Sequence, residues 1–156
     1  MTNKQHPGWR VYTGGTFDIL HRGHLNLLQQ CRKIAGPDGT VVVGLNSDDF
    51  ISRYKQRPPM LDYGNRRDLL EACRYVDEVV ENEGNEDSKV VLTKVAPDFV
   101  VIGSDWASRD YYAQMMFTQE WLDEHAISLV YVPYTEGISS TDVRNRARAT
   151  PVGAAR

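Results

Sequence analysis

Residues 13–28 read TGGTFDILHRGHLNLL, a glycine turn followed by apolar residues at helical spacing. The run 9–15 that leads into this turn is β-rich, so the stretch predicts a strand, a turn and a helix that begins near Gly23. Gly14 and Gly15 leave the backbone uncovered beside a helix N-terminus, where amide donors and the helix dipole favour a phosphate group. The stretch therefore predicts a strand–helix unit with an anion site at its turn.

The rest of the chain repeats this alternation of strand and helix. Short apolar runs typical of buried strands occupy 9–15, 40–46, 77–81, 98–103 and 128–133. Helical patterns begin at His24 and near Ser139, and cover 63–75, 86–96 and 109–124. This order predicts an α/β fold, a Rossmann-like open parallel sheet of about five strands flanked by helices. In such a sheet ligands bind at the carboxyl ends of the strands.

Length and composition are those of an ordinary soluble globular protein. The 156 residues predict a single domain with a core over about 10–148, and we expect 1–8 and 150–156 to be irregular. The 41% apolar content and net charge of -3 lack the basic excess of nucleic-acid binders. There is no signal-like N-terminus and no apolar run of about 18 residues, so we expect a cytoplasmic protein without membrane contact. The two cysteines are expected to be reduced thiols.

The two histidines of the opening stretch, His21 and His24, lie three residues apart at the predicted helix start. At this spacing both imidazoles can donate hydrogen bonds to one phosphoryl group and so stabilise charge that develops during its transfer. The surrounding residues form neither a Walker A loop nor a G-x-G-x-x-G turn. Two alternatives remain for the pair, a partial metal site or a pair of surface residues.

The string GGTFDILHRGH (14–24) resembles the nucleotidyltransferase signature of the cytidylyltransferase superfamily, including its H-x-G-H element. Later segments occur in the order and at roughly the spacing of the glycerol-3-phosphate cytidylyltransferases, namely RYKQRP (53–58), YGNRRDLLEACRYVDEV (63–79), GSDW (103–106) and TEGISSTDV (135–143). They also resemble the cores of phosphocholine and phosphoethanolamine cytidylyltransferases. The resemblance implies transfer of CMP from CTP to a small phosphorylated alcohol, best represented by glycerol 3-phosphate, with release of pyrophosphate.

The resemblance also implies a set of site residues. The catalytic residues are expected to be His21, His24 and Lys55. The nucleotide is expected to contact Gly14, Gly15, Thr16, Phe17, Gly23, Asp105, Trp106, Thr135, Gly137, Ile138, Ser139, Ser140 and Thr141. The acceptor or its phosphate is expected to contact Asp48, Arg57, Arg66, Arg74 and Tyr134. Mg²⁺ is expected to be held through the triphosphate rather than by protein ligands, and the protein is expected to be a homodimer.

Several basic and acidic residues also allow an interpretation that does not depend on the resemblance. Lys55 and Arg57 lie in a proline-bounded segment that predicts a mobile cationic arm. Arg66 and Arg74, eight residues apart, would share one face of the 63–75 helix, either facing phosphate or paired with nearby acids. Asp18 and Asp48 follow the first two strands, where carboxylates bind Mg²⁺, cap helices or contact substrate.

Two segments near the end of the chain carry similar alternatives. Trp106 follows the fourth strand and would stack on a base, cover the acceptor or fill the core, while Asp105 could accept from an exocyclic amine. Ser139 is a candidate N-cap with Asp142 as its capping-box partner. The hydroxyls beside it would then face the triphosphate.

Three departures from the family pattern weaken the assignment of the acceptor. Tyr134 stands where the family has arginine, and Arg144 or Arg146 could replace that cation. Ser104 replaces a carboxylate, and the segment 107–124 is longer than expected. Three alternatives therefore stay open: an adenylyltransferase, a cytidylyltransferase with another acceptor such as a phosphonate, and a non-catalytic nucleotide-binding module.

Overall fold

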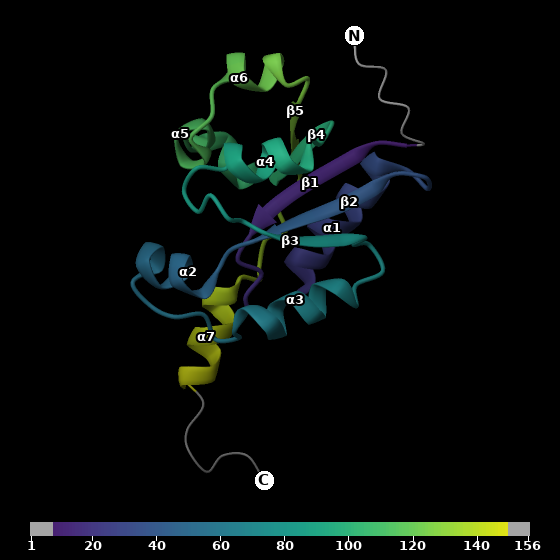
Figure 1. Ribbon diagram of the computed structural model, residues 1–156. Helices are drawn as coiled ribbons and strands as arrows, with labels where there is room; N and C mark the ends of the chain where they lie inside the picture. The colour runs from purple at the N-terminus through teal and green to yellow at the C-terminus, as the bar shows by residue number, and fades with distance from the viewer. Residues whose placement is uncertain (1–7, 150–156) are drawn as a thin grey trace.

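The computed structural model describes residues 8–149 and contains a five-stranded sheet in which neighbouring strands are all parallel. The strand order is β3-β2-β1-β4-β5 (Figure 1). The strands are β1 (Arg10–Gly15), β2 (Thr40–Leu45), β3 (Glu78–Glu81), β4 (Phe99–Gly103) and β5 (Ser128–Val132). The predicted α/β fold is therefore confirmed. The tail and nearly all of the leader that the sequence predicts lie outside the described residues.

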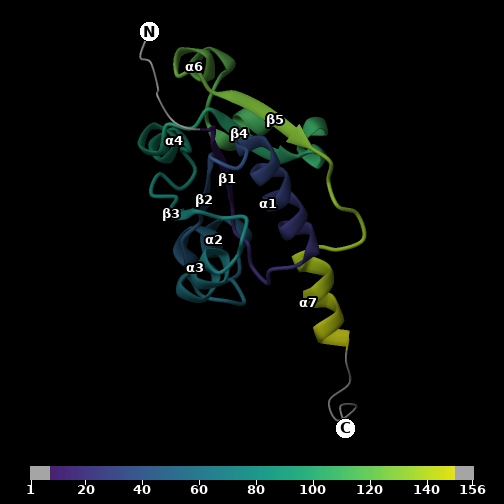
Figure 2. The ribbon, with the colours of Figure 1, turned by 90° about the vertical axis from the view of Figure 1, so that its right-hand side faces the viewer.

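Seven helices and one 3₁₀ turn connect or follow these strands within the described residues. They are α1 (Arg22–Ala35), α2 (Asp48–Lys55), α3 (Tyr63–Glu71), α4 (Lys89–Val95), η1 (Ser104–Ser108), α5 (Tyr111–Met115), α6 (Gln119–Glu124) and α7 (Ser140–Ala149). Figure 2 shows α1 and α4 on opposite sides of the sheet, while α7 extends away from it. None of the described helices is long and apolar enough to cross a membrane.

Both faces of the sheet are buried, as expected for parallel strands. Successive residues of β1 point to opposite faces: Val11 packs with residues of α1, whereas Tyr12 packs with residues of α4, α5 and α6. A third cluster joins α1 to α3 through Leu28 and Leu70, both fully buried. Cys31 lies in the α1 core, and both cysteines are free thiols. Burying each such aliphatic side chain contributes about 1.5–3 kcal/mol, so these clusters fix the strand ends that build the site.

The segment 109–124 is not the continuous helix that its pattern predicts. After the 3₁₀ turn η1, α5 ends at Met115 and is followed by Met116, which adopts a left-handed φ of 56°. A new helix, α6, then begins after Thr118, whose side chain accepts a hydrogen bond from the Trp121 amide. A right-handed helix cannot continue through a left-handed residue, so the segment divides into two short helices.

The helix α2 was not predicted, and the expectation of an irregular arm at Lys55 is wrong. Ser47 caps this helix by accepting from the Phe50 amide at 3.1 Å, with two aspartates in the first turn. Lys55 is its last residue, and Gln56 ends it with a left-handed φ of 55°. The signal in the sequence is the Ser-Asp-Asp run, which favours a helix N-terminus. The predicted helix 63–75 also ends early, at Glu71.

Candidate active site

The carboxyl ends of the strands open into two adjoining cavities. The first, of about 270 Å³, is lined by the starts of α1 and α7 and by the ends of β4 and β5. The second, of about 240 Å³, is lined by residues of α2 and α5 and by the ends of β1 and β4. Gly14, Ile102 and Trp106 line both cavities, so molecules bound in the two would meet at the edge beside Gly14.

Backbone hydrogen bonds fix both histidines of the first cavity. The Nδ1 of His21 accepts from the Gly23 amide at 3.0 Å, and the Nδ1 of His24 accepts from the His21 amide at 3.2 Å. The pair thus forms a capping box at the N-terminus of α1, with the two rings stacked 3.8 Å apart. An Nδ1 that accepts carries no proton, so each neutral ring carries its proton on Nε2. Both histidines line the cavity, so Nε2–H is the ring group that each has available for a ligand there.

The same surroundings keep the two rings neutral. Burial lowers the pKa of His21 and lowers the pKa of His24 further, to about 4, where the adjacent His21 adds to the effect. Nearby Asp18 opposes that shift and Lys55 supports it. Neutral imidazoles at pH 7 act here as hydrogen-bond donors, not as cations.

We expect the protein to lose stability as the pH falls from about 6.5 to about 4. The unfolded chain protonates His24 near its ordinary pKa of 6.5, whereas the folded chain resists protonation until about pH 4. The unfolded state therefore binds more protons in this window, and the free energy of unfolding falls with a slope of up to about 1.4 kcal/mol per pH unit. Urea titrations across the window measure this slope. His24→Asn should flatten this slope. An unchanged slope in that variant would mean that His24 is not the group whose protonation lowers the stability.

The N-terminus of α7 meets the N-terminus of α1 at the first cavity (Figure 2). Ser139 caps α7 by accepting from the Asp142 amide at 3.1 Å, as predicted, and the Ser140 hydroxyl donates to the Asp18 carbonyl at 2.6 Å. Ahead of them, Thr135 accepts from the Asn26 side chain of α1 at 2.9 Å. Two helix dipoles therefore direct their positive ends toward the same space, which favours a polyanion.

Asp18 is a buried structural carboxylate. It accepts hydrogen bonds from the Met60 and Leu61 amides at 2.8 and 3.0 Å, and it forms an ion pair with Arg144 of α7. Both residues are nearly inaccessible to solvent. The sequence offered Arg144 or Arg146 as a replacement for the missing cation opposite phosphate. Arg144 does not fill that role here, because it is paired with Asp18. Both oxygens of Asp18 are likewise occupied.

The predicted phosphate contact of Arg66 is not what the structure contains. Its side chain is fully buried and donates to the carbonyl oxygens of Leu61, Thr16 and Asn46 at 2.8–3.0 Å. It also pairs with Asp48 at 2.6 Å. Arg66 thus joins the ends of β1 and β2 to α3, and Asp48 is held in that network outside both cavities.

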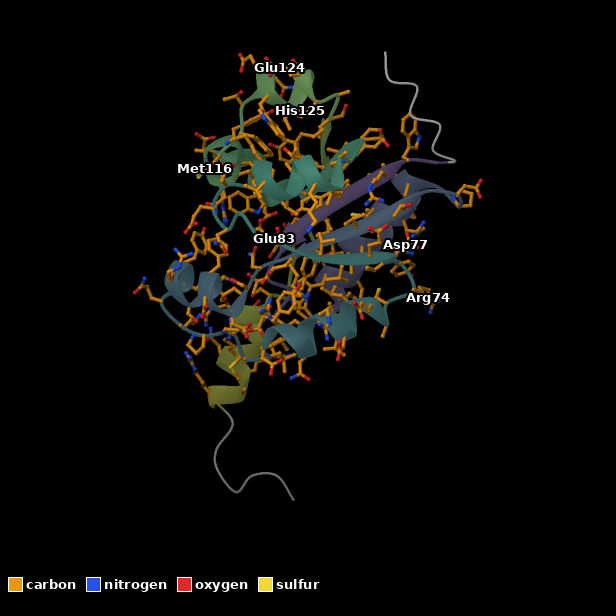
Figure 3. The ribbon with its side chains drawn as sticks, viewed as in Figure 1. Arg74, Asp77, Glu83, Met116, Glu124 and His125 are labelled. Atoms are coloured by element: carbon orange, nitrogen blue, oxygen red, sulfur yellow. The ribbon has the colours of Figure 1, made fainter. Side chains whose placement is uncertain are left out.

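Arg74 is not brought to the site. The helix α3 ends before it, so the expectation that Arg66 and Arg74 share one helical face is wrong. Its guanidinium lies 5.9 Å from the ring centre of Tyr75. Figure 3 shows Arg74 beside Asp77, before β3, at the opposite end of that strand from Glu83. This is the amino edge of the sheet, remote from the cavities.

The other residues predicted for the site divide between the two cavities. The first cavity is lined by Gly14, His21, Gly23, His24, Asp105, Trp106, Tyr134, Thr135, Ile138, Ser139 and Ser140. The second is lined by Gly14, Gly15, Thr16, Lys55 and Trp106. Neither cavity is lined by Phe17, Arg57, Gly137 or Thr141. Of these, Phe17 is buried, and its ring centre lies 5.2 Å from that of His24, so the two rings pack together.

Lys55 provides the cationic group of the second cavity. Partial desolvation lowers the pKa of its ammonium, and the neighbouring charges of Arg144 and Arg57 lower it further, while Asp18 opposes them. A cation surrounded by other cations is stabilised when an anion binds beside it. The position of Lys55 therefore favours a phosphate group at the mouth of the second cavity.

The rest of the second cavity was not predicted. Its polar lining includes Tyr12, Asn46, Asn82 and Gln114. Asn46 and Asn82 directly follow β2 and β3. That position was the available signal, because polar residues that follow parallel strands gather at the ligand-binding edge.

Comparison with known proteins gives four findings. Residues 12–146 match the family model described as cytidylyltransferase-like. The chain is 33% identical over 135 residues to the glycerol-3-phosphate cytidylyltransferase of Bacillus subtilis (strain 168), covering 86% of this chain and 94% of that one. It is 36% identical over 105 residues to the FAD synthase of Korarchaeum cryptofilum, covering 67% and 70%. Among solved structures, the lipopolysaccharide core biosynthesis protein from Thermoplasma volcanium GSS1 shares the fold, with a TM-score of 0.65 over 84% of this chain and 99% of that one, at 24% identity.

Proposed function

The chain belongs to the cytidylyltransferase-like family and is a nucleotidyltransferase, and from this premise we propose that it transfers CMP from CTP to a small phosphorylated alcohol, with glycerol 3-phosphate as the first candidate. The paired imidazole donors of the first cavity carry the proposal. His21 and His24 present their Nε2–H groups where the N-termini of α1 and α7 converge. A triphosphate is the ligand that such a concentration of donors fits.

In the proposed reaction, an oxygen of the acceptor phosphate attacks the α-phosphorus of CTP in line. The new bond joins that oxygen to the α-phosphorus. The bond between the α-phosphorus and the oxygen that bridges to the β-phosphate breaks, and pyrophosphate leaves with its electron pair. The attacking phosphate is already anionic, so no general base is needed. The protein supplies position and charge stabilisation: His21 and His24 donate to phosphate oxygens as negative charge grows, and Lys55 neutralises the phosphate of the acceptor.

The nucleotide is proposed to occupy the first cavity. Its base would lie between Trp106 and Asp105, with the ring stacked on the indole and an exocyclic amine donating to the carboxylate. Ser139 and Ser140 would face the phosphates from the start of α7. Tyr134 also lines this cavity, so its phenol stands where the family pattern has a cation.

The proposal includes Mg²⁺, carried by the triphosphate as part of the substrate. Within residues 8–149 there is no group of three or more His, Cys, Asp or Glu side chains placed to hold a metal ion. Asp18, whose charge acts on His24, already binds Arg144 and two backbone amides. We therefore propose that the ion is held through the phosphates. A homodimer also remains part of this proposal.

Adenylyl transfer is the second candidate, favoured by the similarity to FAD synthase, an enzyme whose name describes formation of an adenine dinucleotide. Both candidates use the same phosphate donors, and they differ in the base that Trp106 and Asp105 would contact. A non-catalytic nucleotide-binding module is the third alternative. The retained pair of donors beside Lys55 argues against it.

Pyrophosphate release tests the proposal directly. Purified protein with Mg²⁺ is given CTP or ATP together with glycerol 3-phosphate, phosphoethanolamine, phosphocholine or small phosphonates. We expect release with CTP and a phosphorylated alcohol. Release only with ATP would identify an adenylyltransferase, and CTP binding without release for any acceptor would identify a binding module.

A further inference from the structure

A tyrosine that lines the second cavity packs its side chain against two glycines. Tyr12 of β1 pairs in register with Val42, while Gly14 pairs with Gly44 further along the same strands. A Cβ built on Gly44 would lie 2.0 Å from the Tyr12 hydroxyl oxygen, and one on Gly14 would lie 2.7 Å from it. Any side chain at these positions would displace the phenol. The glycines therefore allow the hydroxyl to reach the carboxyl edge of the sheet, where Tyr12 lines the cavity.

The Tyr12 hydroxyl has a donor and an acceptor to offer. The residue is 1% exposed, and no hydrogen bond to its hydroxyl is found among residues 8–149. Burial raises the pKa of this phenol, so it keeps its proton at neutral pH. Because Tyr12 lines the cavity, a ligand group there can pair with this hydroxyl.

Asn82, which also lines this cavity, contains a buried polar atom without a partner. Its Nδ2 donates to the Asn46 side chain and to the Asn85 carbonyl, both at 2.9 Å. The Asn85 carbonyl only accepts, so the amide nitrogen must face it and the orientation of the Asn82 side chain is determined. Its Oδ1 is buried without any partner, and the whole residue is only 9% exposed. This oxygen can accept a hydrogen bond and cannot donate one.

The charged residues of this cavity favour a phosphate over an ammonium group. Its charged lining residues are Lys55 and Glu86, and Glu86 already pairs with Arg53 at 2.8 Å. The remaining polar groups are amides and hydroxyls. The cavity thus has one cation for a phosphate, and the carboxylate that lines it is already paired rather than free to hold an ammonium group.

Building on the proposed transfer reaction, we propose that the second cavity selects its acceptor by hydroxyl groups. The Tyr12 hydroxyl and the Asn82 amide oxygen hydrogen-bond the hydroxyls of a phosphorylated polyol or sugar, while Lys55 holds its phosphate. Tyr12 and Asn82 are then specificity-determining residues. Acceptors that carry an ammonium group instead of hydroxyls should be poor substrates, because they leave both buried groups unpaired.

Tyr12→Phe is the sharpest test, because it removes one oxygen and no hydrogen bond within the described protein. We expect the KM for glycerol 3-phosphate to rise about tenfold, with the KM for CTP unchanged, since the variant loses one hydrogen bond to the acceptor and none to the nucleotide. The melting temperature should stay the same or rise. Tyr131→Phe, the same change at an exposed position of β5, serves as the control and should alter neither value.

A panel of acceptors separates hydroxyl recognition from a general defect. The wild-type protein and the Tyr12→Phe and Asn82→Ala variants are compared on glycerol 3-phosphate, ribitol 5-phosphate, propyl phosphate, phosphoethanolamine and phosphocholine. We expect the wild type to prefer the hydroxylated compounds and the variants to lose that preference while their rates on propyl phosphate change little. A wild-type preference for the ammonium compounds, or equal losses on every acceptor in Tyr12→Phe, would overturn the inference.

Direct binding keeps the two proposals distinguishable. If no nucleotide gives pyrophosphate with any acceptor, the proposed function fails, and the inference is then decided by isothermal titration of ribitol 5-phosphate into the free protein. Binding that weakens about tenfold in Tyr12→Phe and is unchanged in Tyr131→Phe would support hydroxyl recognition. Absent binding, or equal binding in both variants, would refute it.

Discussion

Replacing His24 by alanine is expected to lower kcat for pyrophosphate release at least tenfold, and about a hundredfold if its Nε2–H acts as a full transition-state donor. Removing one such preorganised donor costs about 10²–10³ in kcat in other enzymes. The effect should appear in kcat more than in KM, because the hydrogen bond strengthens as negative charge develops on the phosphate oxygens. Steady-state kinetics with saturating acceptor measure it.

The same residue also stabilises the start of α1, so the control must separate the two roles. The His24 Nδ1 accepts from the His21 amide, and losing such a cap costs about 1 kcal/mol. His24→Asn retains a side-chain oxygen for that amide but places no donor at the Nε2 position. It should be nearly as stable as the wild type in thermal melts and nearly as slow as His24→Ala. A folded His24→Asn with wild-type turnover would refute the catalytic role.

Local sequence features predicted the parts of the site that depend on neighbours in the chain. His21 and His24 are three residues apart at a helix start, and the structure places both in the first cavity, held by backbone amides within the same turn. Ser139 caps α7 as its spacing predicts. The five strands follow from apolar runs, because a parallel sheet buries both faces.

Features that depend on distant partners could not be predicted in this way. Arg66 looked like a phosphate ligand, yet it satisfies carbonyl groups at the ends of two strands and at Leu61. Tyr12 looked like an ordinary strand residue, and its place in the second cavity depends on Gly44 in the neighbouring strand. In each case the deciding contact joins residues that the sequence pattern does not relate. Periodicity predicts which face of a helix or strand a side chain lies on. It does not predict which distant residues that side chain will contact.

Arg144→Ala is expected to produce the largest loss of stability of any change considered. It would leave the Asp18 carboxylate buried with two backbone amides and without its counter-charge. Removing one partner of a buried ion pair costs about 3–5 kcal/mol. For a chain of this size that corresponds to a drop in melting temperature of about 10 °C. Arg148→Ala, an exposed change in the same helix, is the matched control and should lie within about 0.5 kcal/mol of the wild type.

The alternative that Arg144 acts as the missing phosphate cation makes the opposite prediction. An arginine that faced the triphosphate would weaken CTP binding when removed and leave the melting temperature of the free protein nearly unchanged. The double variant Asp18→Asn/Arg144→Met distinguishes the two roles, because it removes both charges of the buried pair and should recover part of the lost stability. A free protein that is as stable with Arg144→Ala as without it would mean that the ion pair does not anchor α7, and that Arg144 is available to the nucleotide after all.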